Sequence, residues 1–145
     1  MNAADVMTTG AATARPDTPL VEAAHLMVEH KISGLPVVDG NDRLVGIISE
    51  GDFLRRRPGK GPGLLELLVN EGTADLASRR VEELMTHETI SIAVDTPLAE
   101  IVELMNRHKV RRLPVVTQGK VVGIVSRANL LQALVRKSQA GAKRR

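Results

Sequence analysis

A serine and an aspartate three positions apart, Ser49 and Asp52, stand where the pattern predicts the start of a helix. Ser-x-x-Asp is the spacing of a capping box, in which the serine accepts from the backbone N–H of the aspartate and the carboxylate reaches back to the serine N–H. The equivalent segment later in the chain has Ser126 and Asn129. Asparagine keeps an acceptor but has no charge. The two motifs are therefore alike in spacing and different in electrostatics.

Two arginines, Arg111 and Arg112, precede an apolar segment in the second half of the chain. Basic residues at a helix C-terminus interact favourably with the helix dipole. The corresponding positions of the first half are Ser33 and Gly34, so the dipole does not require the arginines. Because a guanidinium is a planar and permanently charged donor that suits phosphate, the pair is a candidate anion-binding group.

The motifs that would mark an enzyme are missing from the sequence. The chain has no cysteine, which excludes disulfides, thiolate chemistry and Cys-ligated metals. No group of His, Asp and Glu has metal-ligand spacing, and the glycine-rich segment 59–63 has the spacing of neither a P-loop nor a dinucleotide fingerprint. No Ser/His/Asp order marks an exposed nucleophile. We therefore expect a protein that catalyses nothing and requires no metal.

The elements that must position these residues occur twice. Residues 4–38 align with residues 82–116 at a constant offset of 78, and 15 of these 35 positions are identical. After one residue is lost in the following turn the offset is 77, and it aligns Ser49 with Ser126. A repeat of this kind indicates two copies of one structural unit.

Each copy predicts a helix, two strands and a second helix after a short extended lead-in. In the first copy Thr18 is expected to cap a helix that begins at Pro19. Apolar residues then recur with helical spacing, and strands are expected at 35–38 and 44–48. One unit is too small to bury both faces of its sheet. We therefore expect an α/β (α+β) fold in which two repeats pack sheet to sheet with pseudo-twofold symmetry.

The expected boundaries follow the repeats. Residues 1–57 form the first repeat and residues 81–135 the second. Residues 58–80 are expected to be a linker that contains a short apolar helix, and residues 136–145 a basic disordered tail.

These segments together resemble a CBS-domain pair, also called a Bateman module. The resemblance covers residues 4–54 and 82–135. The motifs of the first repeat are Val6-Met7-Thr8, Asp17-Thr18-Pro19-Leu20, Gly34-Leu35-Pro36-Val37-Val38 and Val45-Gly46-Ile47-Ile48-Ser49 with Asp52. Those of the second are Leu84-Met85-Thr86, Asp95-Thr96-Pro97-Leu98, Arg112-Leu113-Pro114-Val115-Val116 and Val122-Gly123-Ile124-Val125-Ser126. The resemblance implies βαββα repeats, frequent dimerisation, and adenosyl ligands in the clefts between repeats.

The resemblance also implies roles for particular residues. Asp52 would accept hydrogen bonds from the ribose hydroxyls, and Ser49 and its helix N-terminus would lie near the phosphate. Arg111 and Arg112, whose segment resembles one in the gamma subunits of AMP-activated protein kinases, would contact the phosphates of the same nucleotide.

Backbone groups of Thr13 and Ala14, and of the strand near Pro36, would bind the adenine edge. The other cleft would receive Asn129 and no arginine pair. The resemblance and this asymmetry together predict one anionic nucleotide per chain.

Composition limits the partners. The formal net charge is +3, with basic clusters at residues 55–57 and 143–145, which a solvated linker and tail explain. The single aromatic residue, Phe53, argues against binding of single-stranded nucleic acid by stacking. No secretory signal is visible and no segment approaches the roughly 18 apolar residues of a membrane span. We expect a cytoplasmic location and no membrane contact.

The sequence therefore predicts a regulatory module that senses an adenine nucleotide, either AMP, ADP or ATP, with S-adenosylmethionine less favoured. It is expected to form a homodimer and to control an unknown partner protein. One alternative is a structural or dimerisation module in which Asn129 and the missing basic residues of the first repeat represent a decayed cleft. The other is nucleic-acid binding through the basic clusters.

Overall fold

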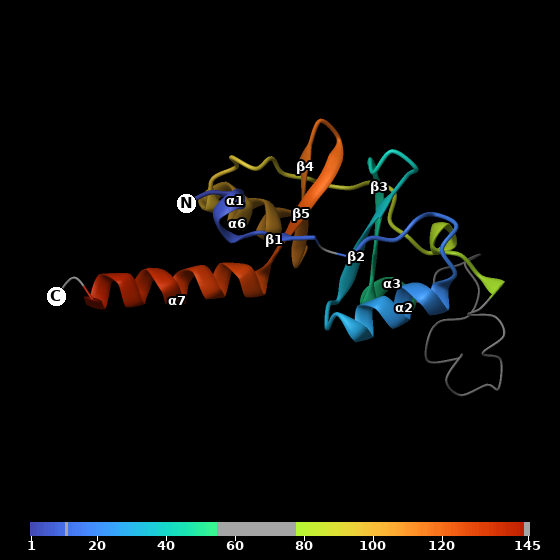
Figure 1. Ribbon diagram of the computed structural model, residues 1–145, viewed down its shortest axis with the longest axis horizontal. Coiled ribbons are helices and arrows are strands. Elements are labelled where there is room, and N and C mark those ends of the chain that lie inside the picture. Colours follow the sequence, from blue (N-terminus) through green and yellow to red (C-terminus); the bar gives the residue numbers. More distant parts are fainter. Residues whose placement is uncertain (11, 55–77, 144–145) are drawn as a thin grey trace. The chain divides into compact units, whose positions relative to one another are not determined.

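The computed structural model describes residues 1–10, 12–54 and 78–143, and these residues form two compact units (Figure 1). Unit 1 consists of Met1–Ala11 and Ile90–Arg145, and unit 2 of Ala12–Thr89. The elements of unit 2 are α2 (Leu20–Glu29), β2 (Gly34–Val38), β3 (Leu44–Ser49), α3 (Glu50–Leu54) and the 3-10 helix η1 (Val81–Glu83). Those of unit 1 are α1 (Ala3–Val6), β1 (Thr8–Thr9), α6 (Leu98–His108), β4 (Arg112–Thr117), β5 (Lys120–Ser126) and α7 (Arg127–Lys143). The mixed α/β class and the helix–strand–strand–helix order of each repeat are confirmed.

In unit 2 the strands β2 and β3 form an antiparallel hairpin that begins at the pair Gly34–Ser49. Asp39 in the turn accepts from the backbone N–H of Asn41 and Arg43 at 2.8 and 3.1 Å, and these bonds lower the pKa of its carboxyl. The helical apolar spacing of α2 and the β-branched residues of the hairpin supply one core, which includes Leu20, Ala23, Met27, Leu35, Val37 and Ile48. Full burial of each of the larger side chains contributes roughly 1.5–3 kcal/mol.

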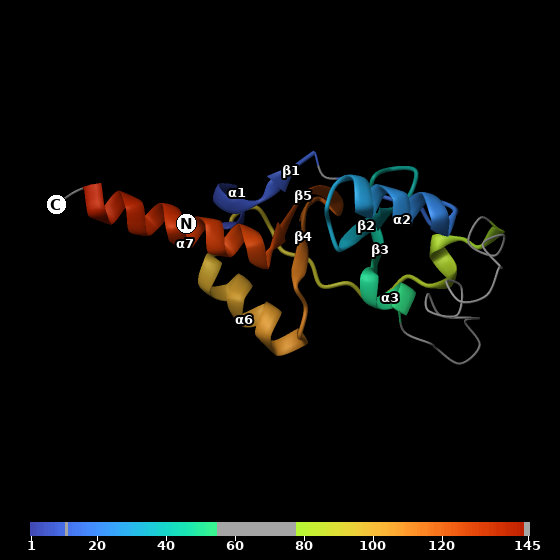
Figure 2. The same cartoon turned by 90° about the horizontal axis from the view of Figure 1, so that it is seen from below.

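Unit 1 repeats this arrangement and adds one strand. Its sheet has the order β1-β5-β4, with both neighbouring pairs antiparallel. Figure 2 shows α1, α6 and α7 on one side of the β4–β5 hairpin. The core of the unit includes Ile101, Met105, Leu113, Val115 and Val125.

The two compact units differ from the two sequence repeats because the lead-ins, the segments before the first helix of each repeat, are exchanged. Met1–Ala11 belongs to unit 1, and the segment that ends at Thr89 belongs to unit 2. Thr8 precedes the first repeat's helix but pairs with Ile124 in unit 1. Thr86 belongs to the second repeat but exchanges two backbone hydrogen bonds with Ile47 of unit 2, at 2.8 and 3.0 Å. The lead-in that the sequence predicts as extended contains a short helix, α1, because Asn2 and Asp5 form a capping box.

Two glycines allow these lead-ins to approach the sheets closely. A Cβ atom on Gly46 would lie 2.9 Å from the backbone oxygen of Thr86, and one on Gly123 would lie 3.0 Å from that of Thr8. Each would also lie within 2.9 Å of the sulfur of the preceding methionine. The glycine of the repeated Val-Gly-Ile motif is therefore required because the backbone of a lead-in, at Thr86 or at Thr8, passes directly over it.

The expected cap at Thr18 is wrong. The helix α2 begins at Leu20, and its N-cap, Pro19, makes no side-chain cap hydrogen bond. The hydroxyl of Thr18 instead accepts from the backbone N–H of Arg15 at 2.9 Å, so it closes the turn before the helix. The N–H of Leu20 donates to the carbonyl of Arg79 at 2.8 Å. A backbone carbonyl from the lead-in therefore satisfies the first helical N–H.

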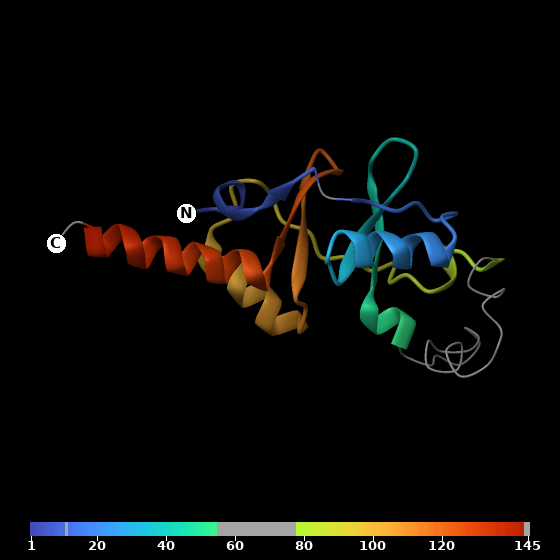
Figure 3. The ribbon, with the colours of Figure 1, turned by 60° about the horizontal axis from the view of Figure 1, so that its bottom comes forward.

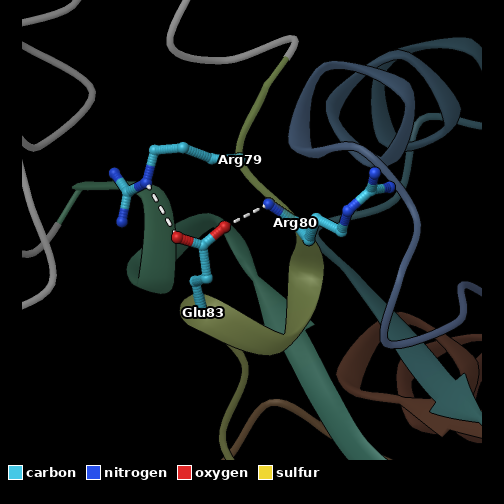
Figure 4. Close-up of polar contacts among 3 residues, drawn as sticks. All are labelled: Arg79, Arg80 and Glu83. Atoms are coloured by element: carbon cyan, nitrogen blue, oxygen red, sulfur yellow. Dashed lines mark hydrogen bonds and ion pairs between the residues drawn. The ribbon is translucent and has the colours of Figure 1, made fainter.

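Arg79, Arg80 and Glu83 fasten this lead-in beside α2 (Figure 4). The carboxylate of Glu83 accepts from the backbone N–H of Arg80 at 2.5 Å and lies 3.7 Å from Nε of Arg79. The guanidinium of Arg80 donates to the carbonyl of Asp17 at 2.6 Å. The repeated Asp-Thr-Pro-Leu motif of the first repeat is thus bound to the lead-in of the second.

The last helix is longer than the sequence predicts. α7 continues to Lys143, whereas disorder is expected from residue 136. The segment contains good helix formers such as Ala140 and Ala142, and it extends a helix that is already nucleated and anchored at Ala133. The predicted linker helix lies outside the described residues. Among the described helices, none is long and apolar enough to cross a membrane.

Candidate functional site

The carboxylate of Asp52 is the centre of the candidate site in unit 2. Its Oδ2 atom accepts from the backbone N–H of Ser49 at 2.8 Å and from the Ser49 hydroxyl at 3.2 Å. Its Oδ1 atom accepts from the hydroxyl of Thr86 at 3.4 Å. Asp52 is 4% exposed and is the only polar residue in the buried class among the described residues. Burial of a carboxylate is costly unless it is hydrogen-bonded, and these three contacts supply the hydrogen bonds.

The sequence did not predict the side-chain contact between Asp52 and Thr86. Thr86 stands 34 positions from Asp52 and is brought to it by the exchanged lead-in. The available signal was the dipeptide Met-Thr, which occurs at 7–8 and again at 85–86. In the second copy Met85 packs against Gly46, and the hydroxyl of Thr86 donates to the carboxylate of Asp52.

Unit 1 contains the same arrangement in a neutral form. Oδ1 of Asn129 accepts from the backbone N–H of Ser126 at 2.8 Å and from its hydroxyl at 2.9 Å. The amide nitrogen of Asn129 donates to the hydroxyl of Thr8 at 3.2 Å. The direction of this last bond is reversed relative to the Thr86–Asp52 bond, because asparagine offers both a donor and an acceptor. The box survives in both units, but only unit 2 holds a negative charge in it.

The predicted adenine-binding residues lie together in unit 2. The N–H of Ala14 donates to the carbonyl of Pro36 at 3.0 Å, and the carbonyl of Ala14 accepts from Val38 at 2.8 Å. Both backbone groups of Ala14 are thus bonded to β2, and Ala14 is buried. Thr13 is exposed. Of the two lead-in residues, Thr13 is the one whose surface is open to a ligand.

Arg111 and Arg112 belong to unit 1. Arg111 is exposed, and its carbonyl accepts from the N–H of Arg127 at 3.0 Å. Arg112 begins β4 and pairs with Ser126. The two arginines therefore lie at the end of the sheet from which α7 begins. Their predicted convergence with Asp52 joins residues of different units and stays a prediction.

Unit 1 also has an open groove between its N-terminal segment and α7. Its volume is ≈ 670 Å³. It is lined on one side by residues 5–8 and on the other by α7 residues that include Asn129, Leu131 and Val135. Among the described residues no cluster of three His, Asp or Glu side chains could hold a metal ion.

Comparison with known proteins identifies the family. A family model described as "CBS domain" matches residues 3–59 and 81–136. The chain belongs to the CBS-domain family. Both matches include the Ser-x-x-Asp or Ser-x-x-Asn box of their repeat, so the two boxes occupy corresponding places in two CBS domains.

Individual relatives agree with this assignment. The chain is 31% identical over 142 residues to the chloroplastic CBS domain-containing protein CBSX1 of Arabidopsis thaliana, and it spans 60% of the length of that protein. A crystal structure of CBSX2, also from Arabidopsis thaliana, in complex with AMP superposes with a TM-score of 0.75 at 33% identity, covering 93% of this chain and 97% of that one. The CBS domain pair of protein MJ0100, crystallised with 5′-methylthioadenosine and S-adenosyl-L-methionine, gives a TM-score of 0.75 at 26% identity, covering 94% and 98%.

Proposed function

We propose that this CBS pair is a regulatory module that binds an adenine nucleotide, AMP, ADP or ATP, and catalyses no reaction. The observation that carries the proposal is the buried and charged box of unit 2, in which Ser49 and Thr86 hold the Asp52 carboxylate. A carboxylate fixed in this way is suited to accept charge-assisted hydrogen bonds from a vicinal diol. The adenosyl ligands of CBSX2 and of MJ0100 all carry a ribose diol, which supports this class of ligand.

In the proposed complex Asp52 binds the ribose hydroxyls, and Ser49 lies near the phosphate. Arg111 and Arg112 bind the phosphates, while Thr13, Ala14 and the strand at Pro36 border the adenine. An anionic nucleotide is favoured over S-adenosylmethionine because two guanidinium groups repel a sulfonium cation and attract phosphate.

Nucleotide binding is proposed to act through assembly. The chain forms a homodimer, and bound nucleotide shifts the equilibrium between two packing arrangements that a regulated partner protein distinguishes. A ligand shifts such an equilibrium only by its difference in affinity for the two states.

A second candidate is a structural module that binds no nucleotide. It is favoured by the geometry of Asp52 itself, because Ser49 and Thr86 already donate to both carboxylate oxygens. In that case Asp52 serves to fasten the lead-in of the second repeat to α3. The two candidates differ in what a nucleotide does to stability.

A thermal-shift series separates them. The protein is heated with AMP, ADP, ATP, S-adenosylmethionine or GTP, each at the same concentration. A ligand at 100 times its dissociation constant stabilises the folded state by roughly 2.7 kcal/mol through mass action. An increase in Tm with adenine nucleotides, and none with GTP, supports the sensor. Unchanged Tm values with all five ligands support the structural module.

A further inference from the structure

An exposed threonine is hydrogen-bonded to one oxygen of the buried carboxylate in unit 2. Asp52 is 4% exposed, whereas Thr86, whose hydroxyl donates to Oδ1 of Asp52, is an exposed residue. The two donors of Ser49 are both on the other oxygen, Oδ2, at 2.8 and 3.2 Å. A ligand hydroxyl that reaches Oδ1 must therefore take the place that the Thr86 hydroxyl occupies.

The backbone of Thr86 is held in position, so only its side chain is free to turn away. Its N–H and C=O exchange hydrogen bonds with Ile47 of β3 at 2.8 and 3.0 Å. The two residues before it, Leu84 and Met85, are buried in the core of unit 2. Figure 3 shows the segment that follows η1 crossing β3 before that strand ends at α3. Release of Oδ1 therefore requires only a change of the χ1 rotamer of Thr86.

The contact between Thr86 and Asp52 is long for a hydrogen bond between two oxygen atoms. Its length is 3.4 Å, whereas O–H···O bonds usually measure roughly 2.5–3.0 Å. It still helps to offset the cost of burying a carboxylate in the empty protein. A ribose hydroxyl at roughly 2.5–2.7 Å would form a stronger, charge-assisted bond with the same oxygen. Exchange of the threonine hydroxyl for a ribose hydroxyl is therefore favourable.

The corresponding threonine of unit 1 has the opposite hydrogen-bond direction. The amide nitrogen of Asn129 donates to the hydroxyl of Thr8 at 3.2 Å. Thr8 thus accepts from its box, whereas Thr86 donates to its own. Loss of the Thr8 hydroxyl is therefore a matched control for loss of the Thr86 hydroxyl.

We propose that Thr86 is a built-in competitor of the nucleotide. Its hydroxyl satisfies Asp52 in the empty protein, and a ribose hydroxyl replaces it when the nucleotide binds. The inference rests on the proposed function, because it concerns the same Asp52 site. The competitor lowers the apparent affinity by the fraction of molecules in which the contact is open. A contact with the strength of an ordinary neutral hydrogen bond gives a reduction of about three- to tenfold, so the site responds at correspondingly higher nucleotide concentrations.

Thr86→Val removes the hydroxyl with little change in shape and gives the sharpest test. Calorimetric titration should find an AMP dissociation constant about three- to tenfold lower than in the wild type, although Tm without ligand is lower. Thr86→Ala should show the same gain, and Thr86→Ser, which keeps a hydroxyl, should bind AMP like the wild type. An AMP dissociation constant that rises or stays unchanged in Thr86→Val and Thr86→Ala overturns the competitor.

Two controls separate competition from a general loosening of the site. Thr8→Val should lower Tm and leave the AMP dissociation constant unchanged. The ligand 2′,3′-dideoxy-AMP has no ribose hydroxyl that could replace Thr86, so Thr86→Val should bind it no more tightly than the wild type does. An equal gain for AMP and for 2′,3′-dideoxy-AMP would show a loosened site and would count against the competitor.

Failure of the competitor is distinguishable from failure of the proposed function. AMP binding by the wild type with no gain in Thr86→Val overturns the competitor and leaves the nucleotide sensor in place. Absence of AMP binding in both proteins overturns the sensor and the competitor together. Binding by Thr86→Val alone supports both, because it reveals a nucleotide site that the Thr86 hydroxyl closes.

Discussion

Replacing Asp52 with asparagine tests the charge of the candidate site with little change in its shape. Unit 1 provides the natural precedent, because Asn129 accepts from Ser126 at the distance, 2.8 Å, at which Asp52 accepts from Ser49. The variant Asp52→Asn should therefore fold, and its free energy of unfolding should change by less than about 1 kcal/mol, the ordinary net contribution of one hydrogen bond.

Nucleotide affinity should fall much more than stability. A hydrogen bond to a charged group contributes roughly 1.5–3 kcal/mol and a neutral one about 0.5–1.5 kcal/mol. The loss of the carboxylate charge toward the ribose diol should thus cost about 1–2 kcal/mol, which corresponds to a roughly 5- to 30-fold rise in the AMP dissociation constant. Asp52→Ala removes the acceptor as well, so it should weaken AMP binding at least tenfold and also lower Tm.

Isothermal titration with AMP and 2′-deoxy-AMP locates the lost interaction. If Asp52 binds the 2′-hydroxyl, the two changes must be non-additive, and removal of the 2′-hydroxyl should weaken binding less in Asp52→Asn, which keeps a neutral acceptor, than in the wild type. Asn129→Asp is the matched control and should leave the AMP dissociation constant unchanged. Equal AMP affinity of the wild type and Asp52→Asn would refute the assignment.

Three further variants test the remaining contacts. Arg111→Ala with Arg112→Ala should weaken AMP binding by roughly two to four orders of magnitude, at about 1.5–3 kcal/mol per lost charge-assisted contact, while adenosine affinity changes little; calorimetry that finds AMP and adenosine equally affected would contradict the phosphate role. Thr86→Val removes a donor to Asp52 and should lower the free energy of unfolding by about 1 kcal/mol, measured by urea denaturation; no change would show that the 3.4 Å contact contributes nothing. Gly46→Ala forces a Cβ against the Thr86 carbonyl at 2.9 Å and should cost about 1–3 kcal/mol, whereas Gly40→Ala, with its nearest neighbour at 4.0 Å, should be tolerated in the same experiment.

The repeat made much of the fold predictable from the sequence. The apolar stripe of α2 and the Leu-Pro-Val-Val strands were located correctly because each occurs twice with the same helical or strand periodicity. The cap at Thr18 was not, because its hydroxyl closes the preceding turn onto Arg15. The first N–H of the helix, that of Leu20, is bonded instead by the carbonyl of Arg79, a residue more than 50 positions away in the sequence.

The candidate site was predictable in part for the same reason. The local box of Ser49 and Asp52 follows from three-residue spacing. The half in which the Asp52 carboxylate accepts from the Ser49 N–H is confirmed, and the Ser49 hydroxyl donates to the same carboxylate. The contact between Asp52 and Thr86, and the exchange of lead-ins that produces it, depend on pairing of distant segments. Local periodicity carries no information on such pairing. The position of Arg111 and Arg112 relative to Asp52 rests on the family resemblance and remains a prediction.

A crystal structure of the protein grown with AMP tests the central claim most directly. The account predicts one AMP per chain, with the ribose hydroxyls about 2.5–2.7 Å from the carboxylate of Asp52 and the phosphate next to guanidinium groups. An AMP molecule bound against Asn129, with no nucleotide at Asp52, would contradict it.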